Sequence, residues 1–161
     1  MTATATRLIL QADTAADLMS ENPISLRADA SVHEAIALMT DRGFAAAPVI
    51  DDTGRPIGVV SVTDILVHDR EYARYLKSDA TVTADLRDRS SLPDDMGIEI
   101  VDRTPISEIM TPAVFTIRPD APASEVVRTM LARKVHHLFV ADDSGVLVGV
   151  ISMGDILRKL G

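Results

Sequence analysis

The sequence contains the same 42-residue unit twice, and this duplication constrains the fold more than any other feature. Residues 25–66, moved by 91 positions, align with residues 116–157 without a gap, and sixteen of the 42 aligned pairs are identical. A period this long excludes a solenoid built from short repeats. Two similar units usually pack face to face about a pseudo-two-fold axis, so we expect paired clefts between them and look there for function.

The first copy predicts the order β-α-β-β-α. An extended segment at residues 24–26 precedes a helix, because the apolar residues between 32 and 39 recur at helical spacing. Two strands follow at residues 46–50 and 56–61, and a second helix begins just after Ser61. The strands are joined by two aspartates, a hydroxyl residue and a glycine, a composition typical of a hairpin whose glycine has positive φ.

The second copy predicts the same elements at residues 114–117, 123–130, 138–141 and 147–152, with a helix starting after Ser152. A short helix is also expected before each copy. The one at residues 15–19 can be capped by Asp13 or Thr14. The one at residues 106–110 can be capped by Thr104, with proline at its first position.

Residues 68–103 have no counterpart in the repeat and form an insert. Ile65, Tyr72 and Leu76 lie at helical spacing, so the helix that begins near Asp64 is expected to run to about Lys77. We therefore expect three segments: residues 1–67 hold an N-terminal extension and the first repeat, residues 68–103 hold a partly helical insert, and residues 104–161 hold the second repeat. The insert is a candidate recognition or dimerisation element.

The composition narrows the classes of function. The chain of 161 residues is 47% hydrophobic and 25% charged, as expected of a soluble globular protein. Its net charge of −8 disfavours nucleic-acid polymers and anionic membranes, although it leaves room for one mononucleotide in a locally basic cleft. There is no cysteine, no apolar run of about 18 residues and no signal peptide, so a cytoplasmic location is expected.

The strongest local motif is Gly-x-x-Ser-x-x-Asp, which contains Ser61 and Asp64 in the first copy and Ser152 and Asp155 in the second. Serine followed three residues later by a carboxylate at the start of a helix is a capping box, and either motif alone is explained by capping. The same helix start also presents free N–H groups to a phosphate and a carboxylate to the hydroxyls of a ribose. Its repetition at equal spacing favours ligand binding.

At this point the sequence resembles the CBS (cystathionine β-synthase) domain, and the tandem copies resemble a Bateman module. The resemblance covers residues 16–66 and 106–160 and includes Met19 and Met110 in the two lead-in segments, Pro48 before the first hairpin, and both junction motifs. It implies an α+β (α/β) fold. Two β-α-β-β-α repeats would be related by pseudo-two-fold symmetry, with small mixed sheets flanked by helices, and two modules would form a disc-like homodimer.

The resemblance also implies a function and a set of site residues. CBS pairs bind adenosine-containing ligands such as AMP, ADP, ATP or S-adenosylmethionine in the clefts between the repeats. The junction aspartates would hold the ribose, the junction serines would assist, and the base would lie near residues 25–26 and 116–117 and the second strand of each repeat. The candidate ligand-binding residues are Ser25, Ser61, Thr63, Asp64, Thr116, Ile117, Arg133, His136, His137, Ser152, Asp155 and Arg158.

The second copy has more basic residues than the first, with Arg133 and His136 near its second strand and Arg158 where the first copy has Val67. These groups are candidate phosphate partners, although cations at a helix end are also explained by the helix dipole. A metal site at His136 and His137 is disfavoured, because adjacent strand residues point to opposite faces. We expect one of the two histidines to face a cleft.

No pattern indicates catalysis: the chain shows no nucleophile with a base at a recognisable spacing and no phosphate-binding glycine loop. Glu34 and Glu125 are interpreted as surface or structural carboxylates. The leading hypothesis is a regulatory module that needs no cofactor and is no enzyme, senses an adenine nucleotide or S-adenosylmethionine, and signals to a separate effector protein. The alternative is a ligand-free dimerisation scaffold.

Overall fold

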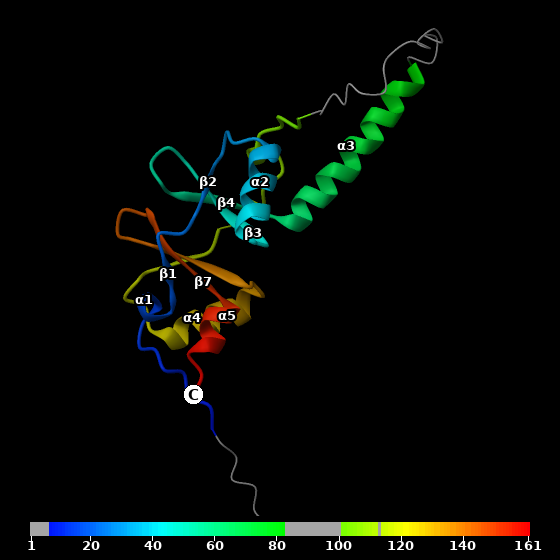
Figure 1. Cartoon of the computed structure of the whole chain (residues 1–161). Helices are drawn as coiled ribbons and strands as arrows, with labels where there is room; N and C mark the ends of the chain where they lie inside the picture. Colours follow the sequence, from blue (N-terminus) through cyan, green and yellow to red (C-terminus); the bar gives the residue numbers. More distant parts are fainter. Residues whose placement is uncertain (1–6, 83–100, 113) are drawn as a thin grey trace, which may run out of the picture.

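Two small mixed sheets form the centre of the fold, one for each repeat (Figure 1). This arrangement comes from a computed structural model that describes residues 7–82, 101–112 and 114–161. The elements in chain order are α1 (Ala15–Leu18), β1 (Ser20–Glu21), β2 (Leu26–Arg27), α2 (Val32–Arg42), β3 (Ala46–Ile50), β4 (Pro56–Ser61), α3 (Val62–Val82), the 3₁₀ turn η1 (Ile106–Glu108), β5 (Thr116–Ile117), α4 (Ala123–Arg133), β6 (His137–Ala141), β7 (Leu147–Ser152) and α5 (Met153–Arg158).

The two sheets repeat one plan, as the duplicated sequence predicts. In the first repeat β2 pairs parallel with β3, which forms an antiparallel hairpin with β4. In the second repeat β5, β6 and β7 pair in the same way. The hairpin glycines Gly54 and Gly145 have φ of 83° and 79°, so the turn prediction is confirmed. The α+β fold and the tandem repeat are confirmed with it.

The lead-in segment of each repeat crosses to the other repeat. Strand β1 joins the second sheet through the pairing of Ser20 with Val150, and the matching bridge pairs Thr111 with Val59 of the first sheet. Ala15 of α1 lies in the core of the second repeat, and Ile106 of η1 lies in the core of the first. Each core is therefore completed by a segment from outside its own repeat.

The junction glycines make this crossing possible. A Cβ atom at Gly58 would lie 2.9 Å from the backbone oxygen of Thr111 and would also collide with Met110. A Cβ atom at Gly149 would collide with Met19. The repeated Gly and Met of the sequence thus meet across the two halves, since only a residue without a side chain allows the lead-in backbone to approach this closely.

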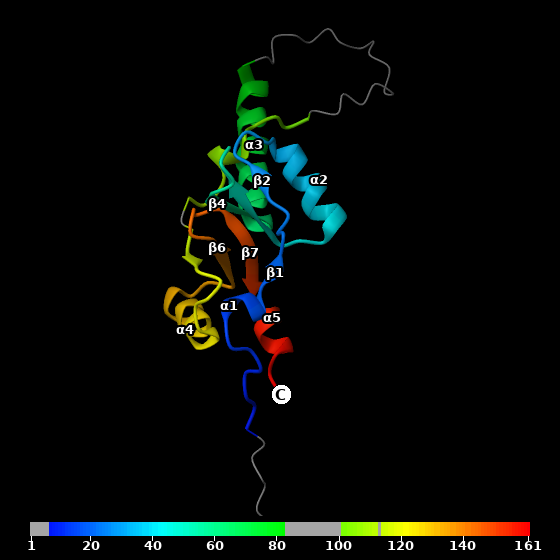
Figure 2. The ribbon, with the colours of Figure 1, turned by 90° about the vertical axis from the view of Figure 1, so that its left-hand side faces the viewer.

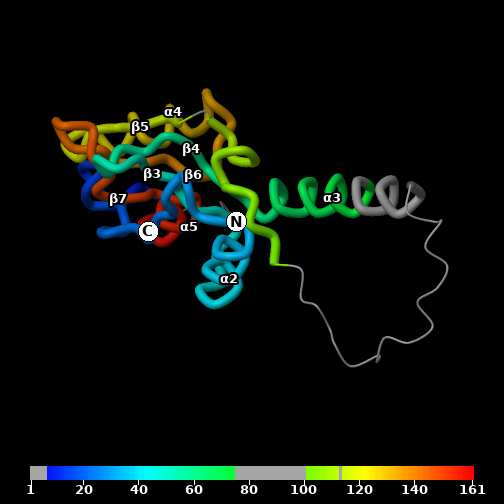
Figure 3. The backbone as a smooth tube through the Cα atoms, turned by 90° about the horizontal axis from the view of Figure 1, so that it is seen from above, coloured from blue at the N-terminus to red at the C-terminus, as the bar shows by residue number. Residues whose placement is uncertain are grey.

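Some predicted boundaries differ in the structure. The helix expected at residues 106–110 is only the 3₁₀ turn η1, because Pro105 is extended and pairs with Ser31 at the start of α2. Thr104 therefore accepts a hydrogen bond from Val32 N–H through its carbonyl oxygen at 2.8 Å instead of starting a helix. Helix α3 continues to Val82, beyond the predicted end at Lys77, and points away from the sheets (Figure 3). Residues 83–100 of the insert lie outside the described residues.

The first described residues lie beside the C-terminus (Figure 2). Ile9 and Gly161 exchange two backbone hydrogen bonds, with N···O distances of 3.0 and 3.1 Å. In the ranges that the structure describes, no helix combines the length and the apolar character that crossing a bilayer requires.

Candidate ligand-binding clefts

Two clefts lie between the repeats, and each contains one of the junction motifs. The Asp155 cleft, of about 400 Å³, is lined by Ser152 and Asp155 of the second repeat. The Asp64 cleft, of about 430 Å³, is lined by Ser61 and Asp64 of the first. Both volumes fall in the range that small-molecule sites occupy.

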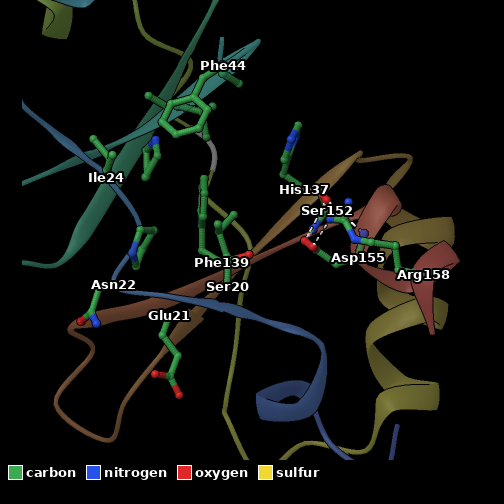
Figure 4. Close-up of a pocket in the computed structure, with 16 residues that line it drawn as sticks. Ser20, Glu21, Asn22, Ile24, Phe44, His137, Phe139, Ser152, Asp155 and Arg158 are labelled. Carbon is green, nitrogen blue, oxygen red and sulfur yellow. Dashed lines mark hydrogen bonds and ion pairs between the residues drawn. The ribbon is translucent and has the colours of Figure 1, made fainter. Parts of the chain in front are cut away.

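The Asp155 cleft is built from both halves of the chain (Figure 4). One side is formed by residues 20–24 and by Phe44 near the start of β3. The other side carries His137, Ser152, Asp155 and Arg158, which Figure 4 shows across the cleft from Phe44 and Ile24. The cleft thus has Ile24 and Phe44 as an apolar, aromatic surface, with polar and charged groups both across from it and beside it in Glu21 and Asn22.

The Asp64 cleft repeats this construction with the halves exchanged. Thr111 and Phe115 take the places of Ser20 and Ile24, and Val135 takes the place of Phe44. Four residues line both clefts and so form the wall between them: Ala46, Val59, His137 and Phe139. The pseudo-symmetry that the sequence predicts therefore applies to the clefts as well as to the sheets.

Both junction motifs form capping boxes at the starts of α3 and α5. Asp64 Oδ2 accepts hydrogen bonds from Ser61 N–H and Ser61 Oγ, both at 2.8 Å. Asp155 Oδ2 accepts the same two bonds from Ser152 at 2.7 and 2.8 Å. Capping uses one carboxylate oxygen of each aspartate, and the second oxygen is left for another partner. Capping and ligand binding are therefore compatible.

The second oxygen of Asp155 has a partner. Arg158 Nη2 lies 2.6 Å from Asp155 Oδ1, and the two groups form an ion pair at the edge of the cleft. Burial alone would raise the pKa of Asp155. The hydrogen bonds from Ser152 and the guanidinium of Arg158 outweigh that effect, so its pKa lies below the ordinary value. The carboxylate is held ionised and ready to accept hydrogen bonds.

The histidine pair lies on the cleft walls. His137 lines both clefts, and His136 lines the Asp64 cleft. The expectation that only one of them faces a cleft is wrong, because β6 begins at His137 and His136 precedes the regular alternation of the strand. Desolvation by the cleft wall lowers the pKa of His137, and the neighbouring His136 lowers it further.

Arg133 lines neither cleft in the described part of the chain, but it contacts a residue of the Asp64 cleft. Its guanidinium carbon stacks 4.8 Å from the centre of the Phe115 ring, which lines that cleft. Of the basic candidates in the second copy, Arg158 lines the Asp155 cleft and His136 lines the Asp64 cleft.

Four other candidate residues do not line either cleft in the described part of the chain. Thr63 is exposed on α3, and Ser25 is half-buried just after the wall segment 20–24. Thr116 and Ile117 line a separate shallow depression, and Ile117 packs in the core of the second repeat. The equivalent residues Ile24 and Phe115, which lie shortly before β2 and β5, line the clefts instead.

The residues that sequence reasoning missed include every phenylalanine of the chain. All three phenylalanines of the chain, Phe44, Phe115 and Phe139, line the clefts. Aromatic residues make up only 3% of the chain, so the positions of its few phenylalanines could have indicated where a binding surface lies. Asn22 also lines the Asp155 cleft with φ of 49°, a left-handed backbone conformation that is uncommon outside glycine.

The described residues contain no group of three or more histidine, aspartate or glutamate side chains that could hold a metal ion. The polar groups that line the clefts are the capped aspartates, serines, imidazoles and one guanidinium, together with Glu21, Asn22 and Thr111. This set suits a ligand that combines hydroxyls, an aromatic ring and negative charge.

Known proteins resemble this chain in sequence over most of its length. The uncharacterised protein MJ1426 of Methanocaldococcus jannaschii is 25% identical over 151 residues, covering 89% of each chain. The chloroplastic CBS domain-containing protein CBSX2 of Arabidopsis thaliana is 26% identical over 150 residues, which is 90% of this chain and 62% of CBSX2.

Solved structures share the fold. The structure of CBSX2 in complex with AMP has a TM-score of 0.67 and 25% identity, covering 91% of this chain and 95% of that chain. The cytosolic domain of the Mg²⁺ channel MgtE in complex with ATP has a TM-score of 0.64 and 25% identity, covering 91% of this chain and 48% of that one. The model of the CBS domain matches residues 15–71 and 106–161. The chain therefore belongs to the CBS domain family, as a tandem CBS pair, or Bateman module.

Proposed function

We propose that this protein is a non-catalytic regulatory module that binds an adenosine-containing ligand in the clefts between its repeats. One observation carries the proposal: each cleft combines an aspartate, held by its capping serine, with an apolar wall that includes phenylalanine. The ligands of two similar structures, AMP in CBSX2 and ATP in MgtE, support the choice of ligand class.

The proposed roles follow from the chemistry of each wall. Asp64 and Asp155 accept hydrogen bonds from the two ribose hydroxyls through the carboxylate oxygen that capping does not use. The base lies against Phe44 and Ile24 in one cleft and against Phe115 and Val135 in the other, where apolar and aromatic contact favours a planar ring. S-adenosylmethionine has the same adenosine group and remains a candidate ligand beside AMP, ADP and ATP.

Signalling follows from the composite construction of the clefts. A ligand that touches the wall segment 20–24 and Asp155 contacts segments from both repeats at once. It therefore favours one relative placement of the repeats, by as much as its affinity differs between the two placements. We propose that a homodimer located in the cytoplasm transmits this change to a separate effector protein.

Isothermal titration calorimetry with AMP, ADP, ATP and S-adenosylmethionine tests this proposal. At least one ligand is expected to bind with a dissociation constant in the micromolar range, and the double variant Asp64→Asn, Asp155→Asn is expected to lose binding. Glu34→Gln is the matched control, because Glu34 forms the same kind of capping box with Ser31 but lines neither cleft. Absence of heat for all four ligands up to millimolar concentration would overturn the proposal.

A ligand-free dimerisation scaffold is the second candidate, and one observation favours it. Val62 and Leu66 on α3 are 42% and 63% exposed, and Met153 and Leu157, 91 residues later on α5, are 49% and 61% exposed. Apolar residues exposed at equivalent positions of two repeats suit an interface between two copies. A thermal-shift panel separates the candidates, because only a binding module is stabilised by a nucleotide.

A further inference from the structure

The two clefts differ in their permanent positive charge. Arg158 lines the Asp155 cleft, whereas the equivalent position in the other half of the chain is Val67. In the described ranges the lining of the Asp64 cleft contains no lysine or arginine, and its basic groups are imidazoles. Arg133 and its equivalent Arg42 line neither cleft in the described part of the chain.

Carboxylates lie near both aspartates, and Glu21 lines the Asp155 cleft itself. Asp64 also lines a depression of about 320 Å³, which carries Glu71 and Glu108 along with His68. Glu71, about two helical turns after Asp64 on α3, and Glu108 of η1 both oppose the approach of a phosphate dianion to this depression. In the other half Asp17 occupies the position of Glu108. The pKa of Asp17 is lowered mainly by hydrogen bonds from Thr14 and further by the charge of Lys159.

The ion pair between Arg158 and Asp155 would respond to both the ribose and the 5′-phosphate of a bound nucleotide. Asp155 Oδ2 is used by the capping bonds of Ser152, so ribose hydroxyls compete with Arg158 for Asp155 Oδ1. A ligand with a 5′-phosphate offers the displaced guanidinium a new charged partner. A nucleoside without phosphate breaks the same ion pair and offers the guanidinium nothing in return.

We infer that Arg158 makes the Asp155 cleft selective for adenosine ligands that carry a 5′-phosphate, whereas the Asp64 cleft accepts adenosine ligands without one. This inference rests on the proposed function and adds to it a residue that determines specificity. The side chain of Arg158 is 73% exposed, so it can turn from the carboxylate towards a ligand without disturbing the core.

Calorimetry with AMP and adenosine tests the inference, because these two compounds differ only in the 5′-phosphate. The full chain is titrated in two backgrounds: Asp64→Asn leaves only the Asp155 cleft competent, and Asp155→Asn leaves only the Asp64 cleft. Asparagine retains an oxygen that can cap the helix, and thermal unfolding checks that each variant is folded. Arg158→Met is then added to the first background, and Val67→Arg to the second.

In the Asp64→Asn background, AMP is expected to bind about tenfold more tightly than adenosine, and Arg158→Met is expected to bring the two affinities within about threefold of each other. In the Asp155→Asn background the two compounds are expected to bind about equally, and Val67→Arg is expected to create a preference for AMP.

A preference for AMP in the Asp64→Asn background that survives Arg158→Met would overturn the inference and leave the proposed function intact. Equal binding of the two compounds in that background, before Arg158 is changed, would have the same meaning. Absence of binding by either compound, in the unmodified protein as well as in both backgrounds, would overturn the proposed function for these ligands and the inference with it.

Discussion

The two lead-in segments perform the same task with different local structures. Ala15 and Ile106 occupy equivalent positions 91 residues apart, and both are fully buried in the core of the opposite repeat. Ala15 begins a short α-helix, next to a capping contact in which Thr14 N–H donates to Asp17 Oδ2 at 2.9 Å. Ile106 begins a single 3₁₀ turn after an extended proline that makes no side-chain cap. The duplication has thus kept the contact across the repeats, and the secondary structure has diverged.

A second comparison, between the clefts, shows the same pattern. The capping geometry of Asp64 and Asp155 is nearly identical, with equal distances of 2.8 Å from the serine hydroxyl to the aspartate. The residues one helical turn later, Val67 and Arg158, differ completely in charge. The groups that build the helix start are the same in both copies, whereas the residues one turn later are not.

The largest expected effect tests whether the two lead-ins are interchangeable. Ile106→Ala gives the first core the residue that Ala15 supplies to the second. Because Ile106 is fully buried, the change should leave a cavity and lower the free energy of unfolding by about 2–5 kcal/mol. Urea unfolding measures this loss. Leu131→Ala is the control, since Leu131 is 73% exposed and its loss should change stability little. A loss of less than about 1 kcal/mol for Ile106→Ala would mean that the cores are equivalent.

An intermediate effect compares the two crossing points. Gly58→Ala should destabilise the protein by about 1–3 kcal/mol, because its Cβ would collide with the backbone of Thr111 as well as with Met110. Gly149→Ala should cost less, since every close neighbour of its Cβ belongs to the Met19 side chain. Double-mutant cycles sharpen the comparison.

Met19→Ala should relieve most of the strain of Gly149→Ala, and Met110→Ala should relieve only part of the strain of Gly58→Ala. Equal relief at both sites would show that the backbone contact at Thr111 does not distinguish the two crossings.

The smallest effect concerns the ion pair between Arg158 and Asp155, which distinguishes the Asp155 cleft from the Asp64 cleft. The folded-state pKa of Asp155 lies below its ordinary value of 3.8, so the ionised carboxylate stabilises the fold above about pH 4. That contribution is lost as the pH falls through the folded-state pKa. The stability difference between the wild type and Asp155→Asn should therefore shrink below pH 4, and its size at neutral pH should stay below about 1 kcal/mol because Arg158 is exposed. Thermal unfolding between pH 7 and pH 3 measures the trend, and a difference that grows on acidification would contradict it.

Most of the local structure could be predicted from the sequence, because it depends on neighbouring residues. The bounds of β3 and β4, the glycine turns and the helix starts after Ser61 and Ser152 all follow from periodicity and turn chemistry. The crossing of the lead-ins could not be predicted in this way. A strand of two residues, such as β1, carries no signal for the sheet that it joins.

The same limit explains the errors in the candidate site. The repeat alignment begins at Ser25, and the wall segment 20–24 lies just before it. The sequence does not show which cleft a basic residue lines: His136 belongs to the second repeat but lines the cleft that contains Asp64 of the first. The repeated pairing of Met19 and Met110 with the junction glycines was the one indication of the crossing, and it is readable only as a contact between distant segments.

The exchange of lead-ins has a consequence for the chain as a folding unit. A cut within the insert would separate Ile106 from the sheet that it covers, and each fragment would present an uncovered apolar face in place of a finished interior. The duplicated halves are therefore not two independent domains joined by a linker. Because each half completes the core of the other, we expect both to gain or lose their native structure together.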